Sequence, residues 1–100
     1  MVRGSTPKHT FTLPIPTSTV KKVRITYEQL GREILEKTED DVKMEENTIT
    51  LRLTQSETLK FKENKDARIQ LKVLTNSGDL LPSQIFTVTV KEILDEEELI

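Results

Sequence analysis

Short runs in which apolar and polar residues alternate recur along most of this chain. Three of them lie between residues 47 and 90, at 48–53, 68–73 and 84–90. Strict alternation places the apolar side chains on one face of a strand and the polar side chains on the other, as in a sheet with one face toward the core. The last two runs flank the turn residues Asn-Ser-Gly-Asp at 76–79, so they are predicted to form an antiparallel hairpin.

The same alternation predicts further strands nearer the N-terminus, at residues 8–13, 20–28, 33–38 and 42–44. Residues 27–37 also favour a helix, because most of them are good helix formers. The central Gly31 and the strands on both sides favour a hairpin there, and the sequence leaves the choice between hairpin and helix open. One helical turn is predicted at 56–59, with Phe61 covering the core just after it.

Seven short strands with turn signals about every 8–12 residues are typical of a two-sheet antiparallel sandwich. The predicted fold is therefore all-β, an immunoglobulin-like sandwich of about seven strands, with a small β-barrel as the alternative. The chain has no cysteine and no tryptophan, so the Cys…Trp…Cys pattern of antibody domains is absent. The prediction therefore concerns the architecture and not membership of the antibody family.

Length and composition fit one small domain with a modest core, since the chain has 100 residues, of which 34% are apolar and 32% are charged. We expect a flexible arm at 1–7, the sandwich at 8–91 and an acidic tail at 92–100. The sequence contains no stretch typical of a signal peptide or a membrane-spanning helix, so neither is expected.

Charge is divided unequally between the two ends of the chain. Residues 1–27 carry basic but no acidic residues, whereas residues 92–98 contain acidic residues only among their charged positions. These opposite charges attract each other either within one chain, whose first and last strands often lie close together in a sandwich, or between neighbouring copies, and both alternatives stay open. The net charge of −2 predicts no binding to nucleic acid.

No group of residues predicts a catalytic, cofactor or metal site. His9 is the only histidine, and the chain has no cysteine and no nucleophile motif that it could serve. The acidic residues 39–41 and 45–46 lack the spacing and the glycine of a calcium-binding loop, so solvated turns are expected. We therefore predict a protein that is not an enzyme and needs no cofactor or metal.

A domain without catalytic residues is expected to act through its surface. Exposed sheet edges can pair with another chain, and the first strand and the strand after Pro82 are candidates for this. The tail combines acidic with apolar residues, which suggests docking on a partner. The residues predicted to contact a partner are Phe11, Leu13, Lys21, Lys22, Leu94, Glu96, Glu97 and Leu99.

Two segments resemble known proteins. The first is His-Thr-Phe-Thr-Leu-Pro at 9–14, and the second is residues 49–61, followed by 69–74 and Gly78. Together they resemble small proteins encoded in phages and prophages of Firmicutes. The pattern Leu-Thr-Gln-x-x-Thr-Leu-x-Phe at 53–61 is similar to the N-terminal β domains of phage baseplate proteins.

The resemblance implies a virion- or tail-associated structural or assembly protein. Its partners would be other phage structural proteins or further copies of itself, in the virion or in the host cytoplasm during assembly. No membrane contact is expected, because the sequence has no apolar run long enough to span a membrane. The resemblance assigns no active-site residue. A small regulatory module that binds a host protein is the alternative function.

Overall fold

The alternating runs form seven strands in the computed structural model, which describes residues 1–94 and 99. The elements in chain order are β1 (Lys8–Thr12), η1 (Thr17–Thr19), β2 (Val20–Gln29), β3 (Arg32–Thr38), η2 (Glu39–Asp41), β4 (Lys43–Glu45), β5 (Thr48–Arg52), α1 (Gln55–Thr58), β6 (Asp66–Thr75) and β7 (Gln84–Thr89). Here η marks a 3-10 turn. Every strand predicted from the alternation is present.

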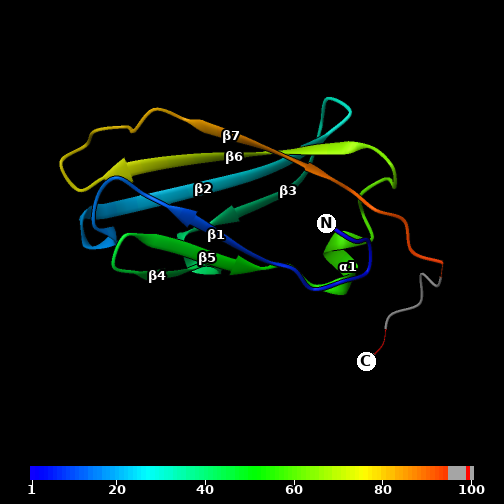
Figure 1. Cartoon of the computed structure of the whole chain (residues 1–100). Coiled ribbons are helices and arrows are strands. Elements are labelled where there is room, and N and C mark those ends of the chain that lie inside the picture. Colours follow the sequence, from blue (N-terminus) through cyan, green and yellow to red (C-terminus); the bar gives the residue numbers. More distant parts are fainter. Residues whose placement is uncertain (95–98, 100) are drawn as a thin grey trace.

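The strands pair into two antiparallel sheets that face each other (Figure 1). One sheet has the order β1-β5-β4 and the other the order β3-β2-β6-β7. The chain passes from one sheet to the other after β1, after β3 and after β5. The predicted sandwich is confirmed, and the alternative of a small barrel is wrong because two separate sheets are present, each with two free edges.

This strand order matches an immunoglobulin-like sandwich from which the first strand is missing. By their neighbours, β1, β5 and β4 take the places of strands B, E and D, and β3, β2, β6 and β7 take those of C′, C, F and G. In the complete fold strand A lies next to strand B. The place beside β1 that strand A would fill is therefore a free edge here.

Residues 27–37 form a hairpin and not a helix. Strands β2 and β3 pair in antiparallel register and are joined by Leu30 and Gly31, whose φ angles are 55° and 76°. Two central residues at positive φ are the mark of a type I′ turn, which matches the twist of the flanking strands. The helix-forming tendency of this segment is overridden because Tyr27 and Leu35, which face each other across the hairpin, are both buried in the core.

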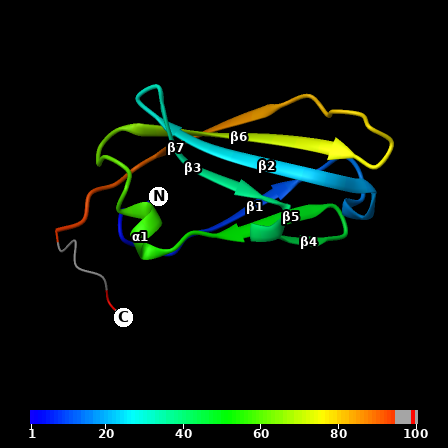
Figure 2. The same cartoon turned by 180° about the vertical axis from the view of Figure 1, so that it is seen from behind.

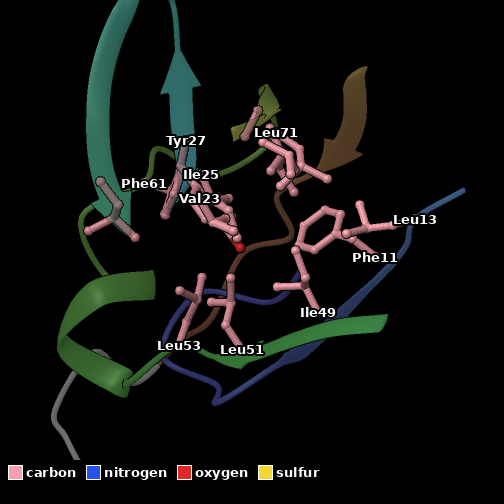
Figure 3. Close-up of a cluster of buried hydrophobic side chains, with 14 of the residues drawn as sticks. Phe11, Leu13, Val23, Ile25, Tyr27, Ile49, Leu51, Leu53, Phe61 and Leu71 are labelled. Carbon is pink, nitrogen blue, oxygen red and sulfur yellow. The ribbon is translucent and has the colours of Figure 1, made fainter. Parts of the chain in front are cut away.

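The inward faces of the two sheets meet in one core, shown in Figure 3. Ile25 and Tyr27 of β2 and Ile49 of β5 have none of their surface exposed. The predicted helical turn is confirmed as α1, which begins with a capping box between Thr54 and Glu57. It covers one end of the sandwich, close to the N-terminus (Figure 2).

The first residues of the chain lie along the end of β7. Val2 pairs in parallel with Lys91, whose N–H donates to the carbonyl of Met1 at 2.7 Å and whose carbonyl accepts from the N–H of Arg3 at 3.1 Å. The amino terminus of Met1 donates to the carbonyl of Thr89 at 2.8 Å. The segment expected to be a flexible arm thus has backbone partners in the structure. Its sequence shows no alternation, so the pattern of apolar and polar residues predicts no strand there.

The turn between β2 and β3 yields a stability prediction. Leu30→Asn should raise the free energy of unfolding by about 0.5–1 kcal/mol, because leucine is strained at positive φ whereas asparagine adopts this conformation readily. The leucine side chain is 56% exposed, so little packing is lost. Chemical denaturation of both proteins measures the difference.

Gly31→Ala serves as the matched control for strain in the same turn. No atom lies within 4 Å of a Cβ placed on Gly31, so a loss of about 1 kcal/mol there would come from its positive φ alone. A Leu30→Asn protein less stable than the wild type would contradict the assignment of the turn.

Candidate functional site

Polar side chains from both sheets and from α1 meet beside the core. The His9 Nδ1 atom of β1 lies 2.6 Å from the hydroxyl of Tyr27 of β2, and the two rings stack with their centroids 5.7 Å apart. Lys37 of β3 forms a salt bridge with Glu57 of α1. These four residues, which we call the polar cluster, connect β1, β2, β3 and α1.

Burial, nearby charge and hydrogen bonding shift the pKa values of three residues of the polar cluster. Burial, and next the carboxylate of Glu57, raise the pKa of Tyr27, so its hydroxyl keeps its proton and is hydrogen-bonded with His9 Nδ1. Burial, and next the positive charge of the amino terminus, lower the pKa of His9. Burial alone would raise the pKa of Glu57, but the hydrogen bonds from Lys37 and Thr54 outweigh it and the pKa is lowered.

The polar cluster joins the two sheets and offers no access to a substrate. Tyr27 has 0% of its surface exposed, so its hydroxyl can meet another molecule only if the sandwich opens. Within residues 1–94 and 99, no three His, Cys, Asp or Glu side chains gather as they would around a metal ion. The cluster therefore fits a structural link, and a contact surface has to be sought on the outside.

The free edges of the sheets differ in charge. Each sheet has two edge strands, which pair with a neighbour on one side only. They are β1 and β4 in one sheet and β3 and β7 in the other. Charged side chains on an edge strand hinder its pairing with another chain. Strands β1, β3 and β4 each carry at least one such residue, whereas β7, with the sequence Gln-Ile-Phe-Thr-Val-Thr, is the one edge strand of the described chain without a charge.

The side of the sandwich between β1 and β7 is incompletely covered. Phe86 of β7 lies opposite Ile69 of β6, whose side chain is only 2% exposed, so both face inward. Phe86 nevertheless is 38% exposed, although its ring lies 5.4 Å from the ring of Phe11. An inward-facing aromatic residue is left exposed here because no strand occupies the place of strand A.

The N-terminal segment covers only part of the β7 edge. Its hydrogen bonds begin at Thr89, so the backbone edge before that residue has no partner strand on its outer side. We call residues 84–88 the β7 edge. On the outer face of the sheet this edge also carries Ile85, which is 57% exposed. A mostly apolar hollow of about 190 Å³ adjoins the start of β7 and is lined by Leu13, Pro14, Leu71, Val73, Leu81, Pro82 and Gln84.

The residues predicted to contact a partner differ in burial, and two of them are in the core. Phe11 and Leu13 are 5% and 3% exposed, so in the single chain their side chains belong to the core. Both residues adjoin the β7 edge, because Phe11 contacts Phe86 and Leu13 lines the hollow at the start of β7.

The other predicted contact residues lie on the surface or outside the described residues. Lys21 and Lys22 are exposed at the start of β2, and Leu94 and Leu99 are 97% and 85% exposed. Glu96 and Glu97 fall outside the described residues. Ile85 and Phe86 are not among the predicted contact residues, but both belong to the strand after Pro82, which the sequence marks as a candidate edge, and no residue between Pro82 and Val90 is charged.

Comparison with models of known protein families, with curated proteins and with solved structures finds no match to this chain. In the part of the chain that the structure describes, no helix has the length and apolar character to cross a membrane. The candidate site therefore rests on the geometry of the β7 edge.

The lowered pKa of His9 predicts a pH dependence of stability. An unfolded chain, in which the pKa of histidine is about 6.5, binds the proton more readily than the folded protein does. The free energy of unfolding should therefore fall as the pH falls from 7 to 5, by at most about 1.4 kcal/mol per pH unit for one proton. Chemical denaturation at several pH values measures this slope.

His9→Gln is the control for the pH prediction, because an amide oxygen can still accept from the hydroxyl of Tyr27 but does not titrate. This variant should show a smaller slope between pH 7 and 5, above the range in which the carboxylate of Glu57 titrates. An equal slope in both proteins would assign the pH dependence to other groups.

Proposed function

We propose that the protein is a non-enzymatic structural or assembly component of a phage or prophage particle, associated with its tail or baseplate, and that it acts through protein–protein contacts. The assignment to a phage rests on the resemblance carried by residues 9–14, 49–61, 69–74 and Gly78, and the assignment to a baseplate rests on the pattern at 53–61. The assignment to protein contact rests on a different observation, which is the uncharged and incompletely covered β7 edge.

The β7 edge supports a contact in which an extended segment of the partner adds as a further strand. Such a strand would hydrogen-bond to the backbone of residues 84–88 and would place apolar side chains over Phe86. Because Phe86 already faces inward, the added strand would lie beside β7 and extend the core on the incompletely covered side of the sandwich.

The size of this edge bears on the strength of the contact. Five residues of backbone and one partly exposed aromatic ring offer less surface than a stable independent interface, which buries about 1,200–2,000 Å². A single contact of this kind is expected to be weak. Repeated contacts between components held in one particle add up through the high local concentration of the sites, which fits an assembly component.

A lysine in the β7 edge tests the proposal. Thr87→Lys adds a charge to an exposed position of β7 and should weaken binding to proteins encoded beside this one by at least about tenfold, or ~1.4 kcal/mol, because a strand paired there would have to accommodate it. Co-purification and titration calorimetry with each of these neighbouring proteins measure the loss.

Thr10→Lys is the matched control, because Thr10 is also an exposed threonine on an edge strand, β1 of the other sheet. It should leave binding unchanged, and circular dichroism should show both variants folded. Wild-type protein that binds none of its neighbours would count against the proposal. Binding to a host protein that Thr87→Lys abolishes would favour the alternative function, a small regulatory module that uses the same edge.

A further inference from the structure

A shallow groove with positive charge lies on the outer face of the sheet formed by β3, β2, β6 and β7. Its volume is about 430 Å³, and three of the residues that line it are the cations Lys22, Arg24 and Lys72. Apolar side chains border the cations, namely Leu74 and Leu80, and Leu80 is 72% exposed. We call these five residues the basic groove.

Two cations of the basic groove oppose each other across neighbouring strands. Arg24 of β2 and Lys72 of β6 are direct partners in the register and lie on the same face of the sheet. Like charges in directly opposite positions destabilise a sheet. This arrangement costs the isolated chain stability and would be relieved by a negatively charged ligand.

The acidic residues near the basic groove offset only part of its positive charge. Arg24 forms a salt bridge with Glu36 of β3, with Nε and Oε1 3.1 Å apart. Glu39 also lines the groove and adds one negative charge, with its Oε1 atom accepting a hydrogen bond from the backbone N–H of Val23 at 3.2 Å. Lys22 and Lys72 have no acidic partner among the residues that the structure describes.

The C-terminal segment of the same sequence has the complementary chemistry. Residues 94–100 read Leu-Asp-Glu-Glu-Glu-Leu-Ile, four acids in a row between apolar residues. Leu94 and Leu99 are 97% and 85% exposed, so their apolar side chains are uncovered in the single chain. A segment of this composition matches a groove in which cations are bordered by leucines.

We propose that the basic groove binds the C-terminal segment 94–100 of a second copy of this chain. The proposal deepens the proposed function by naming a partner, but it uses a surface separate from the β7 edge. Each copy offers one groove and one segment at different places, so the contact is head-to-tail and builds a ring or a filament.

The segment comes from a second copy because Leu99 of the same chain is hydrogen-bonded elsewhere. The backbone N–H of Leu99 donates to Oε1 of Gln55 at 2.9 Å, and its carbonyl accepts from Nε2 of Gln55 at 2.6 Å. Gln55 belongs to α1, at one end of the sandwich (Figure 1). Strand β6 begins at Asp66, at the α1 end of the sandwich (Figure 1). Lys72 lies six residues further along β6, roughly 20 Å from that end.

Light scattering after size-exclusion chromatography of the full chain, at low and at high salt, is the first measurement. We expect oligomers at low salt that dissociate at high salt, because the screening length falls from about 10 Å at 0.1 M to about 3 Å at 1 M. Lys72→Glu should weaken this association by at least about tenfold at low salt, because it replaces an attraction by a repulsion.

Two further variants make this result specific. Lys65→Glu changes the net charge equally at an exposed loop position outside the groove and should associate like the wild type. The double variant Lys72→Glu with Glu97→Lys should associate again, because it restores an opposite pair between copies. A synthetic peptide of residues 92–100 should dissociate the wild-type oligomer, and a scrambled peptide of the same composition should not.

A monomer at all salt concentrations would overturn the inference, and so would equal effects of Lys72→Glu and Lys65→Glu or of the two peptides. The β7 variant separates this inference from the proposed function. If Thr87→Lys abolishes self-association and Lys72→Glu does not, copies meet through the β7 edge, so the inference fails while the proposed function stands. The inference would also fail, and the proposed function would stand, if the wild-type protein does not self-associate and Thr87→Lys abolishes its binding to the proteins encoded beside it.

Discussion

The pairing of β2 with β6 is the interaction on which the rest of this structure depends. The two ten-residue strands pair over almost their whole length, and both present alternate side chains to the core, among them Ile25, Tyr27, Ile69 and Leu71. Full burial of one such side chain stabilises the fold by about 1.5–3 kcal/mol. Strands β3 and β7 attach to the outer sides of this pair, and the other sheet packs on its inner face.

The β7 edge and the basic groove, the two surfaces proposed for contact, each contain a feature that lowers the stability of a single chain. Phe86 faces inward from β7 but remains partly exposed, because the place of strand A is empty. On the opposite face of the same sheet, Arg24 and Lys72 oppose each other with like charge. Departures from local consistency of this kind are expected at functional positions, where a partner supplies what the chain lacks.

The buried polar side chains of Gln29 and Tyr27 form hydrogen bonds with distant parts of the chain. Gln29 is 3% exposed, and its amide donates to the carbonyls of Lys62 and Lys65 at 2.7 and 3.2 Å and accepts from the N–H of Lys62 at 2.6 Å. These three bonds tie the loop before β6 to the end of β2. The pair of His9 and Tyr27 connects the two sheets in a similar way, so the sandwich is held by specific polar links as well as by its apolar core.

The sequence by itself determined the strands, the helical turn of α1 and the sandwich class, because alternation and capping are local properties. The sequence also shows that β7 contains no charged residue. Only the tertiary structure decided the choice of a hairpin at 27–37, the burial of Phe11 and Leu13, the exposure of Phe86 and the pairing of Val2 with Lys91. These features depend on residues far apart in the chain. Alternation shows which side chains of a strand point inward, but not which strand lies beside it or whether anything covers them.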